Sequence, residues 1–288
     1  MTNLSSGSIK RAALAALHKN WKMAIVVSLV VSLLSGGLTG IISVFNQLHT
    51  LRGIQNAQYF TPQPSTPFSG VSSLISLITM FFAPALTVGQ IVFYLKLCRG
   101  KAAGVNDMFA LFRRLERIFK ALAASIIVGL IIALWALLTF IPGFIILWII
   151  PPFLPFVIIL LIAMSVPAIM AAYRYALVLH FMADDFDIGV MEALSKSKET
   201  MYGNRKALFV LHLSFLGWIL LGVAVTFAFA ALGMFVASML VIFVGSLFLM
   251  PYYMAANAEF YLRVVNRDEA IEIDFDSFEE TETNNAEE

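Results

Sequence analysis

Charged side chains are scarce in this chain, and cysteine is almost missing from it. Asp, Glu, Lys and Arg make up 13% of the 288 residues, whereas hydrophobic residues make up 60%. A soluble domain typically carries about 25% charged residues, so this composition excludes an ordinary soluble domain. The single cysteine, Cys98, excludes an internal disulfide.

Sequence signatures of the common catalytic sites are also missing. There is no phosphate-binding loop GxxxxGK[ST], no GxSxG, no HExxH and no GxGxxG. The one carboxylate cluster outside the C-terminal tail consists of Asp184, Asp185 and Asp187. A Mg²⁺ site for a phosphate substrate would need further acids from another segment, and we interpret Asp187 as a helix N-cap. We therefore expect no enzyme, metal or cofactor, and keep a membrane lipid enzyme using these aspartates as an alternative.

Two long uncharged runs dominate the rest of the chain. No charged residue lies between Lys120 and Arg174 or between Lys206 and Glu259, runs of 53 and 52 residues. A membrane-spanning helix needs about 20 apolar residues, so each run holds two spans, and 23–51 and 53–95 hold one each. The predicted fold class is all-α, a polytopic membrane helix bundle in one domain, 1–265. Its six transmembrane helices are predicted at about 23–45, 71–95, 121–141, 153–173, 207–227 and 232–256.

The placement of basic residues predicts the orientation. With six spans, eighteen of the nineteen Lys and Arg residues fall on one side, and only Arg52 falls on the other. Because basic residues stay on the cytoplasmic side in short loops, both termini are predicted to be cytoplasmic. This face suits the lipid bilayer's anionic inner leaflet. Nucleic acid is not expected as a partner, since the charges lie beside spans. Residues 266–288, with ten acids and no base after 267, are predicted to form a disordered cytoplasmic tail.

A proline-rich stretch separates the third and fourth predicted helices. Pro142, Pro151, Pro152 and Pro155 bracket an apolar piece, 143–152, that is too short to cross a bilayer. We predict that the third helix ends at Ile141 and that the fourth begins near 153–155. The piece between them either lies in the outer interface or re-enters as a half-helix.

An amphipathic helix is predicted before each pair of spans, which suggests three repeats at about 5–95, 104–173 and 187–260. The segment "LHKNWKMAI" (17–25) aligns with "MYGNRKALF" (201–209), placing Asn20 opposite Asn204. The face predicted before the third span contains Val105, Met108, Phe109, Phe112, Leu115 and Phe119. The face predicted before the fifth contains Ile188, Met191, Leu194 and Met201.

Stripes of small polar residues mark the first two spans. The candidate residues are Ser28, Ser32, Ser35, Gly36, Thr39 and Gly40 in the first, and Ser76, Thr79 and Gln90 in the second. Small residues let helices approach closely, so the stripes indicate helix packing, within the monomer or in a dimer. The other interpretation is a hydroxyl-lined path for a neutral solute. No ionisable residue lies in the middle of a predicted span, which argues against a charge-relay pump.

A second candidate site lies at the inner end of the sixth span. It comprises Asn257, Glu259 and Arg263. Glu259 either serves a proton or cation or pairs with Arg263 four residues later. His212, near the inner end of the fifth span, is expected to satisfy a hydrogen bond between helices.

The order of several segments resembles a known family. These are "SIKRAALAALHKNWKMAI", "FYLKLCRGKAAGVNDMFALFRR", "LLTFIPGFI", "HFMADDFDIGVMEALSKSKETMYGNRKALFVLHLSFLGWILLG" and "MPYYMAANAEFYLRVV". Together they resemble domain of unknown function 975, over most of 5–265. The resemblance implies a bacterial, multi-pass cytoplasmic-membrane protein and brings no catalytic residues. The proline-rich stretch and the acidic tail depart from the family pattern.

Two functional hypotheses follow. The first is a non-enzymatic membrane component that binds a partner, either a lipid or another membrane protein, including a second copy of this chain. The alternative is a small-solute permease or channel-like transporter that uses the hydroxyl stripes.

Overall fold

The computed structural model describes residues 4–37, 40, 42–43, 69–149 and 154–286. These residues form helices and turns without a strand, so the predicted all-α class is confirmed. The helices are α1 (Ser6–Leu17), α2 (Trp21–Ser32), the π-helical turn η1 (Leu33–Gly37), α4 (Ser69–Cys98), α5 (Val105–Met108), the 3-10 turn η2 (Ala110–Arg113), α6 (Leu115–Ile149), α7 (Leu154–Arg174), α8 (Val178–Asp184), α9 (Val190–Thr200), α10 (Arg205–Ala231) and α11 (Phe235–Ala286).

Five helices of the described part are long and apolar enough to cross a membrane, namely α4, α6, α7, α10 and α11. A sixth crossing is obtained if α1 and the α2–η1 helix are counted as one broken span, bent by 98°. The bend separates the amphipathic α1 from the apolar α2, as expected for a helix on the membrane surface that leads into a span. This is the structure of a membrane protein.

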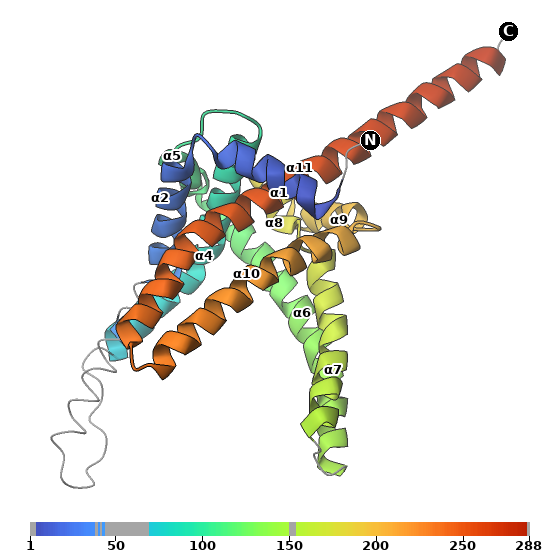
Figure 1. Cartoon of the computed structure of the whole chain (residues 1–288). Helices are drawn as coiled ribbons and strands as arrows, with labels where there is room; N and C mark the ends of the chain where they lie inside the picture. The colour runs from blue at the N-terminus through green and yellow to red at the C-terminus, as the bar shows by residue number, and fades with distance from the viewer. Residues whose placement is uncertain (1–3, 38–39, 41, 44–68, 150–153, 287–288) are drawn as a thin grey trace, which may run out of the picture.

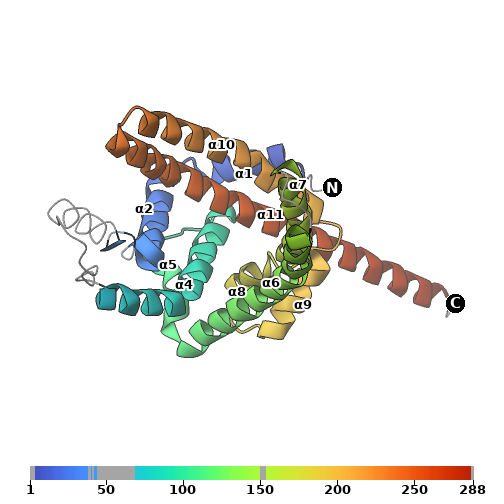
Figure 2. The same cartoon turned by 90° about the horizontal axis from the view of Figure 1, so that it is seen from below.

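The short helices gather at one end of the molecule, and the long helices lead away from it (Figure 1). We call this end the basic end: it comprises α1, α5, α8, α9 and the adjoining ends of the long helices. Away from it, the α6–α7 hairpin diverges from the α10–α11 hairpin, as Figures 1 and 2 both show. The largest fully buried side chains, Tyr94, Tyr261, Phe93, Phe215 and Phe260, come from α4, α10 and α11. The main protein core therefore lies where the long helices converge.

The order of elements agrees with the predicted repeats. A short helical segment followed by two long helices occurs as α5 with α6 and α7 and as α9 with α10 and α11. In the first repeat, α1 is followed by α2, which like α1 has 12 residues, and by the long helix α4. Asn20 is the N-cap of α2, and Asn204, its predicted counterpart, is the N-cap of α10. Leu17 and Met201, three residues earlier in each case, are both fully buried. The aligned segments thus occupy equivalent positions at two helix elbows.

The prediction that the third helix ends at Ile141 is wrong, although the candidate span within it is Leu115–Ile141. Helix α6 begins at Leu115 and continues past Pro142 to Ile149. Proline removes one backbone donor but often kinks a helix without ending it, particularly in a membrane, where hydrogen bonds within the helix have no competitor. Most of the piece predicted to be interfacial or re-entrant is therefore the last part of α6, and 150–153 lie outside the described residues. Helix α7 begins at Leu154, within the predicted 153–155.

The amphipathic helix predicted over 105–119 is also wrong as a single element. The structure divides it into α5, η2 and the start of α6, with Phe109 and Arg114 at the breaks. Met108 is fully buried, but Leu115 is 70% exposed because the breaks rotate it off the common face. In α9, Leu194 is buried as predicted. Met191 is not, with 72% of its surface exposed.

The acidic tail differs from the disordered segment that the sequence predicts. Helix α11 runs from Phe235 through Pro251 and on to Ala286. Figure 1 shows its C-terminal part projecting away from the other helices. Backbone hydrogen bonds are internal to a helix, and a helix that is already nucleated extends at little cost. The C-terminal part of α11 can therefore be helical without packing an apolar face against another helix.

Candidate functional site

The inner part of the small-residue stripe forms a buried polar network between α2 and α4. Ser28 Oγ lies 2.8 Å from Tyr94 Oη and accepts a hydrogen bond from Gln90 Nε2 at 3.3 Å. Tyr94 Oη also lies 3.2 Å from the carbonyl oxygen of Ala24. Ser28 and Gln90 are 4% and 5% exposed. These groups satisfy one another, so Ser28 and Gln90 hold the first two spans together.

The outer part of the stripe is not packed in this way. Ser32, Gly40 and Ser76 are exposed, while Ser35, Gly36 and Thr79 are half-buried. Ser35 and Ser76 donate to carbonyl oxygens one turn earlier in their own helices, those of Val31 and Ser72. A β-carbon on Gly36 or Gly40 would meet no atom of the described residues within 4 Å. Thr39 lies outside the described residues. The candidate residues therefore divide into an inner packed group and an outer open group.

The candidate site at the inner end of α11 is an ion pair that fastens the N-terminus. Arg263 Nε donates to Glu259 Oε1 at 2.9 Å, as one of the two interpretations predicted. Its Nη1 donates to Ser8 Oγ at 2.9 Å, and its Nη2 to the Ser8 carbonyl at 3.3 Å. Both charged side chains are less than 20% exposed. Glu259 is thus occupied by a structural partner that joins α11 to α1.

Asn257 belongs to a second cluster, centred on His212. His212 Nε2 lies 2.9 Å from Asn257 Oδ1 and 3.2 Å from the Tyr253 hydroxyl. His212 Nδ1 lies 3.1 Å from the Tyr173 hydroxyl. The imidazole therefore connects α7, α10 and α11, in agreement with the helix–helix role expected for it. The structure does not bring Asn257, Glu259 and Arg263 together as one site.

The aspartate cluster is occupied by basic and backbone partners. Asp184 accepts two hydrogen bonds from Arg99, at 2.6 and 2.7 Å. Asp185 accepts the backbone N–H of Asp187 at 2.9 Å, and Asp187 faces Arg117 at 3.3 Å. The N-cap predicted at Asp187 is wrong, because α9 begins at Val190 with Gly189 as its N-cap. Within the described residues, no group of three or more His, Cys, Asp or Glu is arranged to hold a metal.

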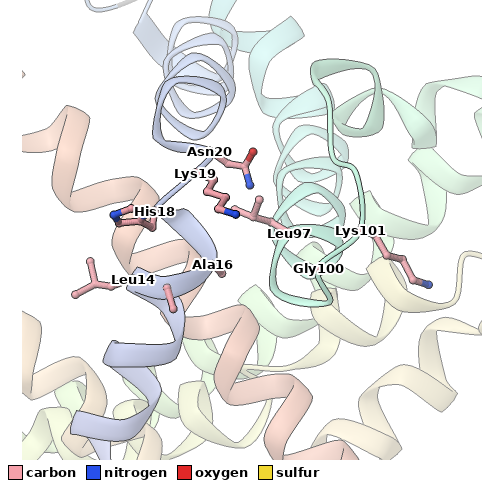
Figure 3. A pocket seen from close by; sticks show the side chains of 9 residues that line it. Leu14, Ala16, His18, Lys19, Asn20, Leu97, Gly100 and Lys101 are labelled. Carbon is pink, nitrogen blue, oxygen red and sulfur yellow. The ribbon is translucent and has the colours of Figure 1, made fainter.

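A hollow of about 630 Å³ lies at the elbow between α1 and α2, beside the end of α4. Figure 3 shows Lys19 extending toward Leu97 from the elbow, while Lys101 points away. Gly100, with φ +69°, turns the chain after α4. Both lysines are exposed, and no acidic side chain lines the hollow. The hollow is open and adds two exposed lysines to the basic end.

The α10–α11 hairpin carries an apolar groove of about 810 Å³, which we call the hairpin groove. Trp21 and Trp218 lie among its lining, which also includes Gly222 and Gly245. Three hydroxyls lie in its lining, those of Thr226, Ser246 and Tyr252. Two of them are used within their own helices: Thr226 donates to the Gly222 carbonyl and Ser246 to that of Phe243, both at 2.8 Å. The groove therefore presents an apolar surface. Sequence reasoning missed it, although Gly222 and Thr226 are small residues four positions apart, a spacing that places them on one helix face.

Comparison with known proteins gives the family and nothing beyond it. No curated protein and no solved structure matches this chain. The model of the family described as "Protein of unknown function (DUF975)" matches residues 1–268, which include every helix of the basic end. The match ends one residue after Arg267, near the beginning of the acidic tail. The chain therefore belongs to the DUF975 family.

Proposed function

We propose that this protein is a non-enzymatic membrane component that binds a partner inside the bilayer. The observation that carries the proposal is the hairpin groove, which is mostly apolar, contains two glycines, and has the Thr226 and Ser246 hydroxyls already hydrogen-bonded within their own helices. An apolar groove of this kind fits a transmembrane helix of another membrane protein or of a second copy of this chain. Helix-in-groove recognition uses such surfaces.

The glycines favour a helix as the occupant. A β-carbon on Gly222 or Gly245 would meet no described atom within 4 Å, so neither glycine is needed for packing against the described residues. Lipid tails are as apolar as the groove, so hydrophobicity alone does not drive association within a bilayer. Close backbone approach over small residues does favour it, through van der Waals contact.

The basic end sits, in this proposal, at the cytoplasmic surface of the bacterial membrane. Its cations suit an anionic leaflet, where each exposed Lys or Arg contributes about 1 kcal/mol. The same placement puts α1 and α9 at the membrane surface. The partner helix then enters the hairpin groove from within the bilayer.

The permease alternative receives less support. It needs the hydroxyls of the first two spans to line a common path. Ser28 is instead consumed in the network with Gln90 and Tyr94, while Ser32 and Ser76 are exposed. No specific contact of the described residues favours transport over partner binding.

The test is photo-crosslinking from the groove in native membranes. A photoreactive residue replacing Ile242, which lines the groove and is 59% exposed, is expected to form one discrete protein adduct. Gly222→Leu should abolish that adduct, because its side chain fills the groove. The matched control is Gly129→Leu in α6, where a β-carbon also meets no described atom within 4 Å. An adduct with lipid alone, or a protein adduct insensitive to Gly222→Leu, would refute the proposed partner helix.

A further inference from the structure

A further cavity lies where α6, α7 and α10 meet near the basic end. It has a volume of about 250 Å³ and is lined by Trp135, Pro167, Met170, Ala171, Arg174, Tyr175 and Arg205. We call it the two-arginine pocket. Arg174 is the last residue of α7, and Arg205 is the first residue of α10. Two elements separated by α8 and α9 thus bring two guanidinium groups to one cavity.

Both arginines contribute donors that are not hydrogen-bonded. The Nε atoms of Arg174 and Arg205 are buried and donate to no atom of the described residues. Neither guanidinium lies within 4 Å of a carboxylate in the described part of the chain, whereas six other cations are paired with acids. Arg174 lies over the Tyr175 ring, 5.8 Å from its centroid. A buried donor without an acceptor is costly, so the pocket is suited to an acceptor from outside the chain.

The charges around the pocket indicate an anion. No acidic side chain lines it. Arg205 also begins a helix of 27 residues, whose free N–H groups carry partial positive charge. Guanidinium groups bind phosphate through paired, charge-assisted hydrogen bonds. A phosphate group therefore satisfies both the orphan donors and the local potential.

The remaining lining is apolar and belongs to membrane spans. Pro167 lies seven residues before Arg174 on α7, which corresponds to about 10 Å along a helix. Met170 and Trp135 are 54% and 42% exposed, and both lie in helices that qualify as spans. The pocket thus joins a cationic end to an apolar flank that faces the bilayer. A soluble phosphate would leave this flank unused, whereas a phospholipid covers it with its glycerol and first acyl carbons.

We propose that the two-arginine pocket binds the phosphodiester of an anionic phospholipid, with Arg174 and Arg205 as the phosphate ligands. Basic pockets between spans on the cytoplasmic side are a known form of lipid recognition. The inference rests on the proposed function only in placing the basic end at the inner leaflet, and it does not require the partner helix. Lipid held here would fix α7 against α10 at a junction where the long helices diverge.

The test measures lipid retained by the purified full-length chain. The protein in neutral detergent is titrated with phosphatidylglycerol or with phosphatidylcholine, and bound lipid is counted by native mass spectrometry. Wild type is expected to retain one phosphatidylglycerol at least roughly tenfold more tightly than phosphatidylcholine. Arg174→Gln and Arg205→Gln should each remove this preference, and Arg174→Lys should restore part of it. Arg114→Gln removes an exposed arginine outside the pocket and should leave the preference unchanged.

The other outcomes are decisive as well. Equal retention of the two lipids by wild type would overturn the proposal. It would also be overturned if Arg114→Gln lost the preference for phosphatidylglycerol to the same extent as the pocket variants. If millimolar inorganic phosphate displaces phosphatidylglycerol completely, the phosphate group alone accounts for the binding, and the assignment to a lipid is overturned. Because the wild-type comparison needs no variant, poor folding of a glutamine variant does not leave the question open. Photo-crosslinking at Ile242, measured on the same variants, reports separately on the partner helix.

Discussion

Arg263 Nη1 donates a hydrogen bond to Ser8 Oγ at 2.9 Å, although the two residues are 255 positions apart in the sequence. The same guanidinium pairs with Glu259. One side chain therefore ties the first helix of the domain to the last, at the end where the long helices converge. The side chains of Arg263 and Glu259 are 19% and 16% exposed. If one of them is removed, water therefore cannot fully replace it as a partner of the other.

Breaking this contact should destabilise the whole basic end. We expect Arg263→Met to lower the free energy of unfolding by about 2–3 kcal/mol, because it leaves Glu259 half-buried without a charge-assisted partner. Arg263→Lys should recover part of the loss. Thermal unfolding of the purified protein in detergent measures both. A variant at the exposed Arg11, Arg11→Met, serves as the control, and an equal loss there would contradict the argument.

Gly89 should not tolerate even one added methyl group. A β-carbon at this position in α4 would overlap the carbonyl oxygen of Met108 in α5. Gly89→Ala is expected to cost about 1–3 kcal/mol, since the two backbones must separate. Gly129→Ala, where a β-carbon meets no described atom within 4 Å, should be neutral or stabilising by up to about 1 kcal/mol. Identical melting temperatures for the two variants would show that α4 and α5 are not in close contact.

Asp107 should make stability depend on acid pH. Burial opposes its ionisation, but the hydrogen bond from Lys96 at 2.6 Å and that from the Gly104 N–H at 2.8 Å outweigh burial and hold the Asp107 pKa below its ordinary value of 3.8. A lowered pKa in the folded state means that the carboxylate stabilises the fold above pH 3.8, and that this stabilisation is lost as pH falls through the lower, folded-state pKa.

The corresponding variant is Asp107→Asn. Because the pair with Lys96 is partly exposed, the variant should lose about 1 kcal/mol or less at neutral pH. The difference between wild type and variant should shrink below pH 4, where the wild-type carboxyl begins to protonate. Melting temperatures measured from pH 7 down to pH 3 test this, and a difference that grows on acidification would contradict it.

Divalent metal should have no effect through the aspartate cluster. Asp184 is held by Arg99 and by the Tyr261 hydroxyl at 3.2 Å, so a cation would have to displace an arginine. We expect the melting temperature to be the same in EDTA and in millimolar Mg²⁺, and Asp184→Asn to lower it in both. Stabilisation by Mg²⁺ that disappears in Asp184→Asn would revive the lipid-enzyme alternative.

The orientation can be read from single cysteines in a Cys98→Ser background. Lys198→Cys, exposed in α9, should not react with a membrane-impermeant maleimide in intact cells and should react after permeabilisation. Gln63→Cys is the control and should react in intact cells, because it lies between the first two predicted spans, on the side opposite the predicted cytoplasmic termini. Labelling of Lys198→Cys from outside would overturn the cytoplasmic placement of the basic end.

The sequence by itself determined the class of protein, five of the six long apolar helices that it predicts, and the gathering of the cations at one end of the molecule. Each follows from a rule that acts on one segment at a time: a bilayer requires about 20 uncharged residues per crossing, and cations resist being moved across it. The equivalence of Asn20 and Asn204 was also predictable, because the short segments around them align in the sequence.

Only the tertiary structure decided what the polar groups do. Local rules did not foresee that α6 would pass Pro142, since a proline in a helix can kink it or end it depending on its surroundings. Nor did they foresee that Ser28 would face Tyr94 or that Glu259 and Arg263 would hold Ser8. The two-arginine pocket is the clearest case. Arg174 and Arg205 are 31 positions apart, and it is the packing of α7 against α10 that brings both into one cavity without an acid to neutralise them.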